Sequence, residues 1–133
     1  MKKIIPLCII GIVAVIVYAV YKNKQAPYAA STVPFVIQGK VYHVLTAKTD
    51  AEQERGLMYL THLQDADGML FIFPTAEYQM FWNQNTYMNL TLYWYHDKTL
   101  LGISYLPSIA ISKNPVTVQS PGPVNYVVEI PIK

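Results

Sequence analysis

Residues 55–86 read RGLMYLTHLQDADGMLFIFPTAEYQMFWNQNT and hold the features that decide the fold of this chain. Within them, residues 69–73 are a continuous apolar run that follows a turn signal ending at Gly68 and precedes Pro74. A short apolar run between such turn residues is typical of a strand that is buried on both faces. We therefore predict a doubly covered strand here, and a second short strand over residues 78–82.

A short helix is predicted directly before this stretch. Thr49 is followed three residues later by Glu52, the spacing of a capping box, in which each side chain bonds the backbone N–H of the other residue. Acidic residues at 50, 52 and 54 complement the positive end of the helix dipole. Gly56 is placed to end the helix after about two turns.

The remaining patterns predict strands joined by turns. β-Branched and aromatic residues are dense in several short runs, which favours extended structure. These runs lie at residues 33–38, 40–47, 89–95, 99–106, 116–119 and 124–130. With one short helix, they predict an α+β fold dominated by antiparallel strands, in a partly closed, barrel-like sheet.

The chain is predicted to divide into an N-terminal segment (1–24), a linker (25–32) and one β-rich domain (33–133). Residues 4–21 carry no charge, and as a helix they would extend about 27 Å, close to the hydrocarbon thickness of a bilayer. We therefore predict a transmembrane helix over these residues, and the basic residues that flank it favour a cytoplasmic N-terminus. We expect a single-pass membrane anchor with an extracytoplasmic domain; the alternative is a cleaved signal segment, which would leave the domain secreted or periplasmic.

The charge and cysteine content of the domain exclude two classes of function. Of ten basic residues, four flank the apolar segment, so six remain beyond residue 25 against eight acidic residues, a net charge of −2. Without a basic surface, nucleic-acid binding loses its main electrostatic contribution, and we expect no nucleic-acid partner. The only cysteine, Cys8, lies in the apolar segment, so the domain has no thiol nucleophile or cysteine-based zinc site.

No recognised set of catalytic residues is present. The three histidines lack the spacing of a metal motif, and although His62 could combine with Asp65 and Asp67, solvated loop residues explain these side chains better. The serines lack a nucleophile-elbow context, and no glycine-rich phosphate loop occurs. We therefore predict no catalytic residue, no metal ion and no cofactor.

One segment of the quoted stretch is a candidate binding site. It places aromatic rings beside several amides, and this combination suits sugars or peptides, because rings stack and amides both donate and accept hydrogen bonds. The predicted ligand-binding residues are Arg55, Trp82, Asn83, Gln84, Asn85 and Thr86. The alternative interpretation is structural, with the rings filling the core and the polar side chains satisfying backbone groups.

Several blocks of the chain match one family pattern. They are ERGLM at 54–58, GMLF at 68–71, FW at 81–82, NT at 85–86 and YVVE at 126–129. In their order and spacing, these blocks resemble the domain of unknown function 192 (DUF192) family. The resemblance implies a β-rich α+β fold and no established activity. The family pattern usually has methionine and a basic residue where Asn83 and Gln84 stand, and aspartate where Thr91 stands, so a shared function that needs those charges would be changed here.

These observations predict a membrane-anchored, extracytoplasmic binding or interaction domain without catalytic activity, whose partner is a protein or carbohydrate of the cell envelope. A first alternative is a cell-envelope hydrolase that uses a carboxylate near Arg55, which requires a cleft holding that carboxylate. A second alternative is a subunit of a surface assembly, with Tyr93 and Tyr95 as its contact strip.

Overall fold

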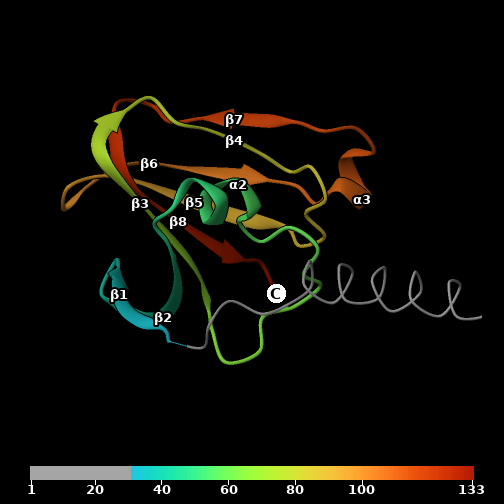
Figure 1. Cartoon of the computed structure of the whole chain (residues 1–133), viewed down its shortest axis with the longest axis horizontal. Helices are drawn as coiled ribbons and strands as arrows, with labels where there is room; N and C mark the ends of the chain where they lie inside the picture. The colour runs from blue at the N-terminus through green and yellow to red at the C-terminus, as the bar shows by residue number, and fades with distance from the viewer. Residues whose placement is uncertain (1–30) are drawn as a thin grey trace, which may run out of the picture.

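The computed structural model describes residues 31–133, which form eight strands and two short helices (Figure 1). The elements are β1 (Val33–Ile37), β2 (Lys40–Ala47), α2 (Asp50–Arg55), β3 (Gly68–Glu77), β4 (Met80–Trp82), β5 (Leu90–His96), β6 (Thr99–Leu106), α3 (Ile109–Ser112), β7 (Thr117–Gln119) and β8 (Val124–Pro131). The predicted strands and helix are present, and α3 was not predicted. Within residues 31–133 no helix is long and apolar enough to cross a membrane; the predicted transmembrane helix lies outside the described residues.

Six strands form one mixed sheet in the order β1-β2-β3-β8-β5-β6. All neighbours are antiparallel except β2 and β3, which are parallel because α2 and the loop after it return the chain to the start of β3. The predicted partly closed, barrel-like sheet is wrong, since β1 and β6 remain separate edges. Local patterns predict each strand correctly but carry no information on whether a crossover or a hairpin joins two of them.

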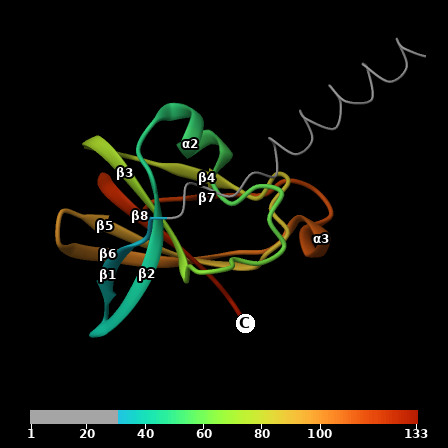
Figure 2. The ribbon, with the colours of Figure 1, turned by 60° about the horizontal axis from the view of Figure 1, so that its bottom comes forward.

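The sheet is strongly curved, so that its β1 edge packs near β5 on one face (Figure 2). The ring of Phe35 on β1 meets the ring of Tyr95 on β5 edge to face, with centroids 5.4 Å apart. Ile37, Val44, Leu70 and Val128 complete this smaller core. Tyr95 is consequently only 7% exposed, which removes half of the tyrosine strip that the surface-assembly alternative needs.

The larger core lies on the other face of the sheet, where α2 and the β4–β7 ribbon cover β3, β8 and β5 (Figure 2). Phe81 on β4 packs edge to face against Phe71, at 4.8 Å between centroids, and against Trp94, at 5.5 Å. Leu57, from the loop after α2, belongs to the same core. The chain before and after β3, which carries α2 and β4, therefore folds back over the sheet instead of extending it.

The predicted helix signals are confirmed. Thr49 Oγ1 accepts a hydrogen bond from the Glu52 N–H at 3.3 Å, and the Glu52 carboxylate accepts one from the Thr49 N–H at 3.0 Å. The backbone N–H groups of Thr49 and Lys48 hold the pKa of Glu52 below its ordinary value. Gly56 ends α2 with a φ of 46°, in the region that favours glycine.

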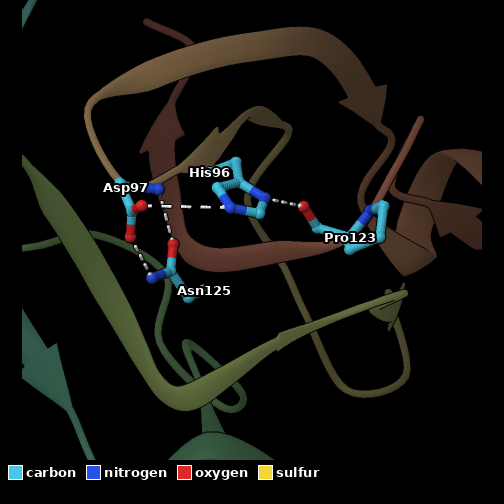
Figure 3. Close-up of polar contacts among 4 residues, drawn as sticks. All are labelled: His96, Asp97, Pro123 and Asn125. Carbon is cyan, nitrogen blue, oxygen red and sulfur yellow. Dashed lines mark hydrogen bonds and ion pairs between the residues drawn. The ribbon is translucent and has the colours of Figure 1, made fainter.

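The tip of the β5–β6 hairpin is fastened to the chain around the start of β8 (Figure 3). The Asn125 side-chain amide donates to Asp97 Oδ1, and the Asp97 N–H donates to Asn125 Oδ1, both at 2.7 Å. His96 Nδ1 lies 2.9 Å from the Pro123 carbonyl oxygen. This histidine therefore takes part in a polar contact that holds the hairpin in place.

Candidate functional site

A cavity of about 280 Å³ opens between α2, β3, β4 and β8. Met80 and Trp82 are 67% and 46% exposed at its mouth, whereas Phe71 is buried and Glu129 is only 4% exposed. The cavity therefore runs from the surface into the larger core. The lining residues are 53–58, Phe71, Phe73, 79–82, Thr86 and Glu129.

Three local features shape the walls. Phe71 and Phe73 are two residues apart on β3, so their rings lie on the same face of the sheet. Gly56 permits α2 to approach that face closely, because a Cβ on Gly56 would stand 3.2 Å from Phe71 Cζ. Phe81 packs into the core between the sheet and the ribbon. The result is an aromatic-walled cavity of the kind that binds small ligands, at the small end of their size range.

Glu129 is the buried charged residue of the cavity. On β8 it stands directly opposite Met69 of β3 and Leu92 of β5, both members of the larger core. Directly paired residues project to the same face of a sheet, so the Glu129 side chain enters that core. No hydrogen bond or ion pair joins its carboxyl group to another group of the described residues, and since no fully buried side-chain oxygen there lacks a partner, its oxygens are accessible from the cavity.

Burial raises the pKa of Glu129 to about 8, because an apolar environment disfavours the charged form of a carboxyl group. At neutral pH the side chain is therefore mostly protonated and can donate a hydrogen bond into the cavity. The other charged residues of the lining, Glu54 and Arg55, belong to α2. A cleft residue with a pKa displaced by desolvation is a strong candidate for function.

Glu129 was not among the predicted site residues. A strand was predicted over residues 124–130, with no role for Glu129. In the structure β8 is a central strand with both faces covered, and Val127, Val128 and Glu129 are all buried. The available signal was a glutamate that directly follows two valines in the sequence. It indicates a buried glutamate only once β8 is known to be a central strand of the sheet.

Of the six predicted ligand-binding residues, Arg55, Trp82 and Thr86 line the cavity, and Asn83, Gln84 and Asn85 do not. Asn83 is fully buried. Its Nδ2 donates to the Pro107 carbonyl oxygen and to Ser112 Oγ, and its Oδ1 accepts from the Val116 N–H, each at 2.8 Å. This amide holds the loop that contains α3, which is the structural role considered as the alternative.

The following residues serve the same local structure. Asn85 has a φ of 54°. Its side-chain Nδ2 donates a hydrogen bond to the Tyr59 hydroxyl oxygen at 3.0 Å, and its backbone carbonyl oxygen accepts one from the Tyr59 N–H at 2.8 Å. The Thr86 hydroxyl donates to the Gln84 carbonyl oxygen at 3.3 Å. These bonds fix the turn that carries Trp82 to the mouth of the cavity.

The described residues contain no cluster of metal-binding side chains. Across residues 31–133, no three His, Cys, Asp or Glu side chains gather closely enough to hold a metal ion. Asp67 instead accepts a hydrogen bond from the His43 N–H at 2.8 Å, and His62 Nδ1 lies 3.2 Å from the Thr61 hydroxyl oxygen. Backbone and neighbour contacts thus engage two of the side chains considered for a metal site.

Residues 33–133 match DUF192, whose description is "Uncharacterized ACR". The chain belongs to the DUF192 family. Its predicted resemblance to that family is therefore confirmed, and the family's YVVE block contains Glu129. No curated protein matches the sequence of this DUF192 chain.

Two solved structures resemble this DUF192 domain. One is a proposed transcription regulator from Sinorhizobium meliloti 1021, with a TM-score of 0.60 and 26% identity, over 77% of this chain and 84% of that one. The other is a protein of unknown function from Novosphingobium aromaticivorans DSM 12444, with a TM-score of 0.58 and 24% identity, over 78% and 83%. The second likeness concerns the fold alone.

Proposed function

We propose that this DUF192 domain binds a small ligand in the cavity that contains Glu129, without altering the ligand chemically. The observation that carries the proposal is a buried carboxyl group, without a partner in the described residues, at the inner end of an aromatic cavity. The oxygens of this group open to the cavity, so a ligand that enters the cavity can supply their hydrogen bonds in place of water.

The lining defines the shape and polarity of this ligand. Aromatic rings and methionines supply six of the fourteen lining residues, and Glu129 and Thr86 are the buried polar side chains among them. Less buried polar side chains of the lining are Gln53, Glu54, Arg55 and Gln79. The ligand that fits the buried part of the cavity is a compound, or a side chain of a partner protein, with an apolar body and a polar group that reaches Glu129.

A ligand screen with two matched variants tests this function. The full-length chain in phosphatidylcholine nanodiscs is screened by saturation-transfer NMR against small aromatic and aliphatic compounds. Trp82 lines the cavity and Tyr87 does not, yet both are 46% exposed. We expect Trp82→Ala to weaken the binding of hits at least fivefold, and Tyr87→Ala to leave it unchanged. A screen without hits, or equal effects of the two substitutions, would overturn the proposal.

The membrane location is part of the proposal and rests on the sequence. An uncharged segment at 4–21 with basic flanks supports a single-pass anchor, with residues 33–133 on the extracytoplasmic side. Alkaline phosphatase fused after Lys133 should be active in intact cells, and green fluorescent protein at the same place should be dark if the fusion is exported through the Sec pathway. Release of the phosphatase fusion from membranes would support the cleaved alternative, and an inactive fusion would contradict export.

A cell-envelope hydrolase is the second candidate, because Glu129 and Arg55 line one cavity. A carboxyl group that stays protonated at neutral pH is suited to act as a general acid. The exposed Glu54 at the rim is the other carboxylate of the lining. Mass spectrometry of the screen hits after incubation with the protein distinguishes the two functions. If the domain only binds ligands, the hits stay intact. If it is a hydrolase, wild type hydrolyses them and Glu129→Gln does not.

A further inference from the structure

We propose that the polar group of the ligand is a cationic amine, seated against the Glu129 carboxyl group and between the aromatic rings of the cavity. This inference rests on the proposed binding function and specifies its ligand class. It follows from the aromatic walls, the carboxyl group and the charges around the cavity.

The walls of the cavity attract cations. Phe71, Phe73, Phe81 and Trp82 all line it. The face of an aromatic ring carries negative potential, and an ammonium group within about 6 Å of a ring centroid is stabilised, most strongly where water is excluded. A negatively charged ligand group would be repelled by the ring faces, and the protonated Glu129 would offer it no positive charge.

The carboxyl group supplies the matching anion. Of the elements that surround the cavity, only α2 adds further charged side chains to the lining, Glu54 and Arg55, and these have opposite signs. The cavity-facing residues of β3 and β4 are uncharged, as are Met69 and Leu92, which flank Glu129 on the neighbouring strands. Hence no lysine or arginine among the described residues already pairs with Glu129, and the place of its counterion is open to the ligand.

Binding of the amine releases the proton of Glu129. The ammonium keeps its own protons and donates one in a hydrogen bond to a Glu129 oxygen, and the proton that Glu129 carried passes to solvent. Because burial raises the pKa of Glu129 to about 8, the free protein holds this proton at pH 6.5. About one proton is therefore released for each amine bound at that pH. A neutral ligand would release none.

Three probes of nearly equal shape test the ligand class: 2-phenylethylamine, 2-phenylethanol and phenylacetate. Their binding to the full-length chain in phosphatidylcholine nanodiscs is measured calorimetrically at pH 6.5, in buffers of different ionisation enthalpy, with empty nanodiscs as the blank. We expect the amine to bind at least tenfold more tightly than the alcohol, with release of about one proton, and phenylacetate to bind more weakly than either.

Two variants assign this preference to the cavity. Glu129→Gln keeps the size of the side chain and its neutral state, and it should remove the preference for the amine and the proton release, while the alcohol binds within twofold of wild type. Trp82→Leu, at the exposed mouth, keeps apolar surface and removes a ring, and it should weaken the amine severalfold more than the alcohol. Near-ultraviolet circular dichroism verifies that both variants are folded.

The outcomes separate this inference from the proposed function. Equal or tighter binding of the alcohol or of phenylacetate would overturn the amine inference and leave ligand binding in the cavity intact. An amine preference that persists in Glu129→Gln would overturn it as well. Failure of all three probes, together with a screen without hits, would overturn the binding function itself.

Discussion

The buried carboxyl group of Glu129 makes the stability of the domain depend on pH. Burial raises its pKa from the ordinary 4.5 to about 8, so the folded chain binds this proton more tightly than the unfolded chain. The contribution of Glu129 to stability is therefore complete below pH 4.5, falls as the pH rises from 4.5 to 8, and is lost above pH 8. At about 1.4 kcal/mol for each tenfold change in proton affinity, the total effect is roughly 5 kcal/mol.

Glu129→Gln tests this effect, because the variant cannot ionise. The free energy of unfolding of the full-length chain is measured by urea denaturation from pH 5 to pH 9. Relative to the variant, wild type should lose about 4 kcal/mol over this range, the part of the total that lies above pH 5. This is a large fraction of the 5–15 kcal/mol by which a typical domain is stable. The variant should therefore be the more stable protein at pH 9.

The control is Glu77→Gln, which removes an exposed carboxylate. Its pH profile should run parallel to that of wild type, because this variant keeps the Glu129 carboxyl group. If wild type and Glu129→Gln lose stability in parallel between pH 5 and pH 9, the Glu129 carboxyl group is not desolvated. That result would refute the proposed role of Glu129 in the cavity.

Two further predictions concern the residues that build the site. Gly68→Ala should lower the free energy of unfolding by about 2–4 kcal/mol, since a Cβ there would collide with the backbone carbonyl oxygen of Glu129; an unchanged urea midpoint would contradict this close approach. Asn83→Ala should lower the free energy of unfolding by about 2–4 kcal/mol, because it leaves the Val116 N–H and the Pro107 carbonyl group without their hydrogen-bond partner. The exposed Asn114→Ala serves as its control, and equal losses in the two variants would refute the role of Asn83.

Much of the fold was predictable because it depends on neighbours in the chain. The capping box between Thr49 and Glu52 joins residues three apart, and Gly56 ends the helix through its own backbone conformation. The strands over residues 89–95 and 99–106 were predicted from their composition, and β5 and β6 occupy these ranges as an antiparallel pair. Of the six predicted ligand-binding residues, Arg55, Trp82 and Thr86 line the cavity, and their role in binding stays a prediction.

The part that could not be predicted depends on contacts between distant segments. Asn83 resembled a binding amide, yet its three partners come from the loop at residues 107–116. The parallel pairing of β2 with β3 likewise follows from a crossover that no local pattern specifies. Each case needed the position of a second segment, far along the chain, before the role of the first could be known.

Gly56 and Gly68, within residues 55–86, separate what the sequence determined from what the tertiary structure decided. By itself the sequence determined that glycines end α2 and begin β3, because chain direction and secondary structure respond to nearest neighbours. Only the tertiary structure decided that Gly68 lies against the backbone of Glu129, and that this glutamate faces an aromatic cavity. Burial depends on what covers both faces of a strand, and β8 is covered by elements from throughout the chain.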